Sequence, residues 1–218
     1  MRSLWHRVLE LLTPGIRVVL GLLSVGCLAS IIGTFSGLYD LDRWLALSGP
    51  GFWSGQVWQI ITYVVLPGSL LNFLMNALMI VLLGRSLERI WSRREVWFYC
   101  VVVTAGTGLA KVLFQFSLPS SLAGSAPLVF GLIAAWGFLF RNEKISLGWG
   151  GEMTVGLVAF LAGVVNFVVI LFSAGLSNAL IMLGGGLAGL LYLWLQARMI
   201  MARASRIVQS ERIQRLEI

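Results

Sequence analysis

The chain has 218 residues, of which 58% are hydrophobic and only 11% are charged. A soluble domain is about 45–50% apolar and about 25% charged, and a soluble fold of this size has no core large enough to bury so much apolar surface. The composition therefore excludes a water-soluble protein and predicts an all-α integral membrane protein. The net charge of +7 lies at the edges of the apolar runs, so we attribute it to orientation in a membrane and expect no nucleic-acid partner.

Six apolar runs are candidates for membrane-spanning helices. A spanning helix needs about 20 mostly apolar residues. The runs are 16–38, 70–87, 96–116, 126–140, 153–173 and 179–201, of which 126–140 is the shortest. The first run follows Arg2 and Arg7, as the core of a signal peptide would. It is longer than a typical signal core and leads into more apolar sequence, so we interpret it as an uncleaved first span.

Charge predicts the orientation of these spans. The segment before and into the first span carries +2, residues 85–95 carry +2, and the C-terminal end carries +3, whereas the loop 39–56 carries −1. Positive charge accumulates on the cytoplasmic side of membrane proteins. Six spans with both termini in the cytoplasm satisfy this pattern, and the two predictions agree with each other.

The sequence divides into a short cytoplasmic segment (1–15), one membrane domain (16–201) and a basic cytoplasmic tail (202–218). We expect the tail to form a basic amphipathic helix on the anionic inner leaflet, with a solvated, frayed tail as the alternative. A single histidine, His6, and two cysteines, Cys27 and Cys100, are too few for a structural zinc site. We expect no metal and no cofactor, and we expect both cysteines to be buried free thiols.

Two asparagines in the second predicted span are candidates for a functional site. Asn72 and Asn76 are four residues apart and therefore project from one face of a helix. An amide in lipid is costly, so both should face the interior of the bundle. They could simply hydrogen-bond neighbouring helices together. Alternatively, they could present amide donors to an oxyanion or to a backbone carbonyl of a client protein.

Small residues in the last span predict close helix packing. Gly185 and Gly189 form a small-xxx-small pair, and Met182 lies on the same helical face. We expect these glycines to pack on the fourth span, which contains Gly131, and to bring Met182 close to Ala126. Packing is the simpler role for this face.

Ser125 directly precedes the fourth span and is well placed to cap it, with Pro127 in the first turn. A nucleophilic serine would instead need a nearby base. His6 lies before the first span, on the opposite side of the membrane from Ser125, which excludes a Ser–His pair within this chain. Lys111, at an outer helix end, is expected to extend its amine toward the membrane surface.

Three segments in order resemble the rhomboid family of intramembrane serine proteases. They are GQVWQIITYVVLPGSLLNFLMNALMIVLLGRSLERIW (55–91), GSAPLVFGLIAAWG (124–137) and SNALIMLGGGLAGLLYLWL (177–195). The second resembles the segment that carries the family's nucleophilic serine, and the third resembles the sixth helix with its histidine and glycines. The resemblance covers about residues 15–200 and implies a six-helix rhomboid-like bundle.

The resemblance fails at the chemistry. It places Ala126 at the nucleophile position and Met182 at the general-base position. Asn72 matches the histidine that helps bind the oxyanion, and only the family's asparagine, Asn76, is retained. An alanine cannot attack a carbonyl and a thioether cannot accept a proton at neutral pH, so both partners of the catalytic dyad are missing.

These observations leave several hypotheses for function. The first is an inactive rhomboid-like protein that binds transmembrane segments of client proteins without cleaving them, through Asn72, Asn76, Ser125, Ala126 and Met182. The second is an active intramembrane protease, or a chain derived from one, either inactivated by substitution or using an unrecognised arrangement. A transporter or channel ranks last, because we find no acidic residue within a span. We expect the chain in a bacterial inner membrane.

Overall fold

The computed structural model describes residues 14–36, 41–114, 121–146 and 152–216. Most of the described chain is helical. Its main helices are α2 (Pro14–Ser36), α6 (Leu70–Leu87), α7 (Arg93–Phe114), α8 (Ala126–Leu139), α9 (Val155–Ala174) and α10 (Leu176–Leu216). Between them lie α3 (Leu41–Leu45), α4 (Gly49–Trp53), α5 (Gln59–Thr62), the 3-10 helix η1 (Tyr63–Val65), and strands β1 (Lys144–Ser146) and β2 (Glu152–Thr154).

Within the described residues, five helices are long and apolar enough to cross a membrane: α2, α6, α7, α9 and α10. Helix α8 is apolar but has only 14 residues. At 1.5 Å per residue it is about 21 Å long, shorter than the roughly 30 Å hydrocarbon core of a bilayer. All six correspond to the apolar runs of the sequence.

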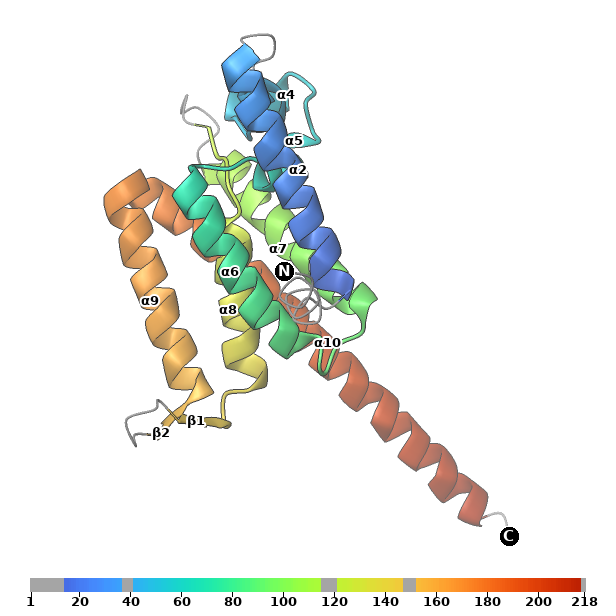
Figure 1. The fold of residues 1–218 in the computed structure, drawn as a ribbon. Helices are drawn as coiled ribbons and strands as arrows, with labels where there is room; N and C mark the ends of the chain where they lie inside the picture. Colours follow the sequence, from blue (N-terminus) through green and yellow to red (C-terminus); the bar gives the residue numbers. More distant parts are fainter. Residues whose placement is uncertain (1–13, 37–40, 115–120, 147–151, 217–218) are drawn as a thin grey trace.

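The helices form a bundle in which α7, α8 and α10 lie at the centre (Figure 1). Helix α10 packs most extensively on α7 and also contacts α8 and α9, while α2 packs on α6 and η1. Helix α8 lies between α6 and α9 and contacts both. Successive long helices alternate in direction, so α2 begins and α10 ends at the same end of the bundle.

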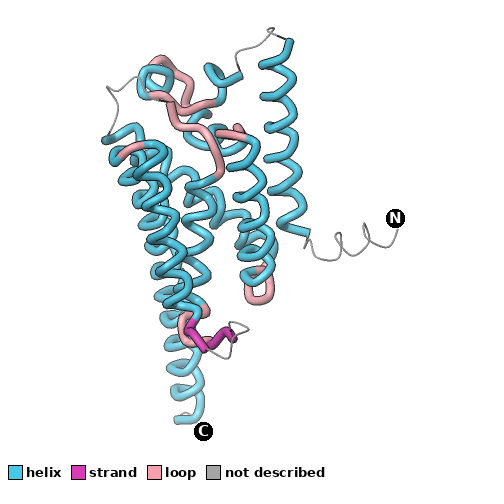
Figure 2. The backbone as a smooth tube through the Cα atoms, turned by 60° about the vertical axis from the view of Figure 1, so that its left-hand side comes forward, coloured by secondary structure: helices cyan, strands magenta, loops and turns pink. Residues whose placement is uncertain are grey.

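The two ends of the bundle differ. We call one the hairpin end, because it carries the antiparallel pair β1–β2, in which Ile145 lies opposite Met153 (Figure 2). Our sequence analysis did not predict this hairpin. Helix α10 continues past the hairpin end as one helix to Leu216, in line with its own axis rather than turning aside (Figure 1). We call the other the loop end; it carries α3, α4 and α5.

The core is apolar, and several of its buried polar side chains are hydrogen-bonded within the bundle. Tyr99 of α7 is fully buried and donates a hydrogen bond of 2.6 Å from its hydroxyl to the carbonyl of Gly131 in α8. Cys27 and Cys100 are buried and free, as predicted. Large apolar side chains cover the outer faces of α2, α6 and α9, which is the surface expected against lipid.

At the loop end, backbone hydrogen bonds hold the segment before α8 in place. Leu47 and Leu122 exchange two of them, at 2.9 and 2.8 Å, and the N–H of Gly124 donates to the carbonyl of Tyr63 at 3.0 Å. Gly124 has φ of 116°, a left-handed conformation that suits glycine. These bonds satisfy backbone groups that lipid could not satisfy. They fix the position of Ser125, the next residue.

Candidate functional site

The candidate site is a polar recess where the loop-end parts of α6 and α8 meet, and it is formed by Asn72, Asn76 and Ser125. Ser69 caps α6 by accepting a hydrogen bond from the N–H of Asn72, so the helix begins there and places Asn76 one turn further along the same face. The Nδ2 group of Asn76 donates to Oδ1 of Asn72 at 2.7 Å and to Oγ of Ser125 at 3.1 Å.

The side chains of these three residues differ in how far they are exposed. Asn76 and Ser125 are buried, at 7% and 4% exposure, whereas the Asn72 side chain is exposed. Asn76 uses both of its N–H groups within the recess. Within the described part of the chain, the Nδ2 group of Asn72 and the hydroxyl of Ser125 donate no hydrogen bond, so these are the donors that the recess can offer. Our prediction that both asparagines present donors is corrected in this respect, because Asn76 acts as an internal link.

Ser125 occupies the N-cap position of α8, as predicted, but its side chain makes no capping hydrogen bond. Its hydroxyl oxygen instead accepts from Asn76 across the helix interface. The prediction of a side-chain cap is therefore wrong. Pro127, in the first turn of α8, has no N–H that would need a cap.

The positions that the rhomboid resemblance assigns to the catalytic dyad are apolar and packed. Met182 is buried in a cluster with Ile170 and Ala179, and Ala126 packs against that cluster. Met182 and Ala126 therefore belong to one apolar contact region, as the sequence predicted. This region has a methyl group and a thioether where a serine protease has a nucleophile and a base.

The glycine face of α10 does not pack where the sequence analysis placed it. A Cβ atom on Gly185 would collide with Thr107, and one on Gly189 would collide with Tyr99, so both glycines face α7 rather than α8. Gly131 of α8 also faces α7, against Val103. The prediction of the fourth span as partner is wrong because a small-xxx-small pair indicates close approach but not the neighbour approached.

Two polar side chains within the spans lie where the sequence analysis did not predict them. Lys111 of α7 is fully buried, so the expectation that its amine extends toward the membrane surface is wrong. Asn166 of α9 was missed by the sequence analysis. Its Oδ1 atom is buried and has no hydrogen-bond partner among the described residues. A lone amide in an apolar span was the available signal.

The described residues contain no group of three or more His, Cys, Asp or Glu side chains that could hold a metal ion. Chemically, the recess is a site for hydrogen bonding. It offers an exposed amide and a hydroxyl at the start of a helix, beside an apolar contact region.

Comparison with known proteins assigns the chain to a family. Residues 17–199 match the family described as eukaryotic integral membrane protein (DUF1751), a rhomboid-like family, and the chain belongs to it. No curated protein matches the chain. The chain is therefore an integral membrane protein.

The family also corrects one expectation. Its description points to a eukaryotic membrane, so our prediction of a bacterial inner membrane is wrong. Span length and positive-inside charge are similar in bacterial and eukaryotic bilayers, so neither feature could have separated them.

Proposed function

We propose that this protein is a rhomboid-like membrane protein without a Ser–His dyad, which binds transmembrane segments of client proteins and does not cleave them. The observation that carries the proposal is the exposed amide of Asn72 beside the buried Asn76–Ser125 pair. A polar group facing lipid is costly unless water or a partner satisfies it. A client helix that is unwound at Gly or Pro exposes backbone carbonyls, which would accept hydrogen bonds from Asn72 and Ser125.

The proposal includes six spans with both termini in the cytoplasm. The alternating helix directions and the charge distribution support it. In this proposal the short helix α8 also crosses the membrane, and its start at the loop end lies below the membrane surface. In the segment before it, Leu122 and Gly124 are buried and their backbone groups pair with residues 47 and 63, which is compatible with that depth.

Helix α8 lies between α6 and α9. We expect clients to approach this side of the bundle, where the exposed surfaces of α6 and α9 flank α8. Apolar side chains on α6 near the recess, including Leu71 and Met75, are more than half exposed. On α9, Val165 and Val169 are similarly exposed. A transmembrane helix could contact both surfaces while its unwound carbonyls reach Asn72.

A photo-crosslinking experiment tests this proposal. A photoreactive residue at Met75 is compared with one at Leu22, an exposed position of α2 on another face of the bundle. The probes are two single-pass segments that differ only by a central Gly-Pro or Leu-Leu pair. We expect capture of the Gly-Pro segment from position 75, several-fold above Leu-Leu, and little capture of either from position 22.

Asn72→Leu provides the decisive variant. Asn72→Leu removes the acceptor of one Asn76 N–H and should cost about 1 kcal/mol, but because Asn72 itself is exposed we expect the bundle to stay folded, whereas replacing the buried Asn76 would disturb packing. We expect Asn72→Leu to lower capture of the Gly-Pro segment to the Leu-Leu level. Equal capture of the two segments, or capture insensitive to Asn72→Leu, would rule out the recess as the binding site.

A further inference from the structure

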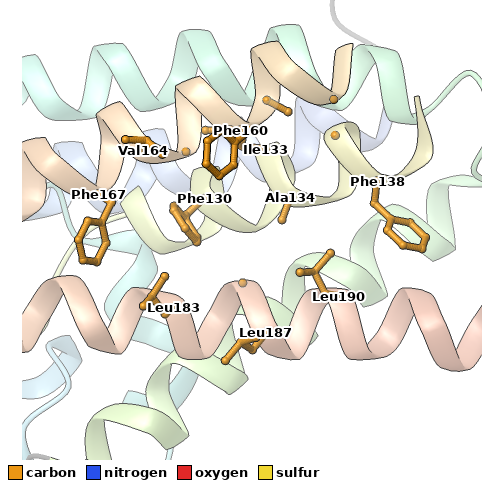
Figure 3. Close-up of a pocket in the computed structure, with 15 residues that line it drawn as sticks. Phe130, Ile133, Ala134, Phe138, Phe160, Val164, Phe167, Leu183, Leu187 and Leu190 are labelled. Carbon is orange, nitrogen blue, oxygen red and sulfur yellow. The ribbon is translucent and has the colours of Figure 1, made fainter. Parts of the chain in front are cut away.

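A second feature of the bundle is an apolar groove of about 610 Å³ between α8, α9 and α10 (Figure 3). Helices α9 and α10 are joined at the loop end by Gly175 and α8 forms the floor between them. The groove is lined by aromatic and aliphatic side chains and by helix glycines, among them Phe130, Phe160, Gly163, Leu183 and Leu187. It is separate from the polar recess, which lies between α6 and α8.

In a membrane such a groove is filled by something apolar. Unfilled space forfeits dispersion contacts for every atom that lines it, and water would find almost no polar partner there. The candidate occupants are a lipid chain and a helix. A helix with its side chains is about 10–12 Å wide, so it could place only one face in a groove of 610 Å³. An acyl chain is thinner and flexible and could lie wholly within the groove, so it would fill more of this space than a helix.

Cationic side chains lie beyond the hairpin end of the groove. Arg141 lies two residues after the end of α8, and its carbonyl accepts a hydrogen bond of 3.3 Å from the N–H of Gly156, a groove residue. Trp194 and Arg198 follow Leu187 by seven and eleven residues and so continue its face of α10. The guanidinium of Arg198 lies 4.0 Å from the centre of the Trp194 ring.

The charges around this position favour an anion. Arg141 and Arg198 are exposed and form no ion pair with the described residues. Of the acidic residues at this end, Glu152 is paired with Lys144 at 2.9 Å, and Glu95 accepts hydrogen bonds from Ser92 and from Gln196 of α10. Gln196 is two residues from Arg198 and so lies on another face of α10, which leaves Glu143 unpaired among the described residues nearby. Guanidinium groups match the geometry of phosphate. In the orientation proposed above, on which this step rests, the hairpin end faces the cytoplasm, and the cytoplasmic leaflet is the anionic one.

We propose that the groove holds one acyl chain of an anionic phospholipid, with its phosphate headgroup against Arg141 and Arg198. The apolar lining binds the chain, and the two arginines select the headgroup. Any lipid would fit the groove by shape, so charge decides which lipid is retained.

The test uses the full chain in nanodiscs and photoactivatable lipids that carry a diazirine in one acyl chain. Phosphatidylserine is compared with phosphatidylcholine of the same chain length. Labelling of groove residues is measured by peptide mass spectrometry relative to labelling of α2 in the same sample, which corrects for general lipid contact. We expect the groove-to-α2 ratio to be at least three-fold higher with phosphatidylserine.

Two sets of variants separate chain from headgroup. A Cβ on Gly163 would have only Phe130 near it, at 3.9 Å, so the Cβ atom of Gly163→Leu makes no clash. The remaining atoms of the leucine side chain then fill part of the groove. Gly21→Leu is the matched control, because a Cβ on Gly21 of α2 has nothing within 4 Å. We expect Gly163→Leu to lower groove labelling by both lipids several-fold, and Gly21→Leu to leave the groove signal unchanged.

For the headgroup, Arg141→Gln with Arg198→Gln should remove the preference for phosphatidylserine. The control pair Arg85→Gln and Arg89→Gln, at the same end on the α6 side, should retain it. Equal labelling by the two lipids in the wild type, or no effect of Gly163→Leu, would overturn the proposal. Absence of groove labelling by either lipid, with a photoreactive poly-leucine transmembrane peptide crosslinked to groove residues instead, would also overturn it and identify a helix as the occupant.

Discussion

The Nδ2 group of Asn76 in α6 and the Oγ atom of Ser125 at the start of α8 lie 3.1 Å apart, hydrogen-bonded across 49 positions of sequence. This bond joins the second and fourth apolar helices at the base of the recess. The Ser125 side chain makes this bond across the helix interface and no capping bond to its own helix.

A double-mutant cycle on Asn76 and Ser125 should show coupling. Ser125→Ala leaves one Asn76 N–H without its acceptor, and we expect a loss of about 1 kcal/mol in the free energy of unfolding. Adding Ser125→Ala to Asn76→Ala should cost clearly less than it does alone. Reversible unfolding in detergent measures all four proteins. Strictly additive losses would contradict a direct bond.

Gly185→Ala should destabilise the bundle, because even a methyl group collides with Thr107 of α7. Overpacking of this kind costs about 1–3 kcal/mol. Gly21→Ala is the control: it has open space around it and should change the melting temperature little or raise it slightly. Thermal unfolding of the purified variants measures both, and an unchanged melting temperature for Gly185→Ala would show that α10 and α7 are not in this close contact.

The chain should not react with serine-directed fluorophosphonates or cleave rhomboid substrates. Position 126 has no hydroxyl, and Met182 supplies no base. Ala126→Ser with Met182→His should give at most weak activity, because in the rhomboid resemblance Asn72 replaces a histidine that helps to bind the oxyanion. Gel-based labelling measures this, with Ser125→Ala as the control. Labelling of the wild type that Ser125→Ala abolishes would revive the protease hypothesis.

Cysteine labelling should place the two ends of the bundle on opposite sides of the membrane. Ser54 at the loop end and Asn142 at the hairpin end are both exposed. In sealed cells or vesicles of known orientation, we expect an impermeant thiol reagent to label Ser54→Cys from the non-cytoplasmic side. It should label Asn142→Cys only after permeabilisation. The buried Cys27 and Cys100 give a low background, and the reverse pattern would refute the N-in orientation.

Sequence alone determined the class of protein and the positions of its helices. A composition this apolar requires lipid rather than water around most of the outer surface. In lipid, a run of apolar residues forms a helix because each backbone group must be paired within the segment. The four-residue spacing of Asn72 and Asn76 likewise follows from helix geometry and predicted their shared face.

Only the tertiary structure decided which neighbour each face meets. Gly185 and Gly189 predict a close contact from sequence, but their partner proved to be α7, and it is the adjacent Gly186 that approaches Phe130 of α8. The roles of Ser125 and Lys111 were also set by packing: one accepts from Asn76 and the other is buried. Local rules act over one helical turn, whereas these contacts join residues tens of positions apart, and their energies depend on how the whole bundle closes.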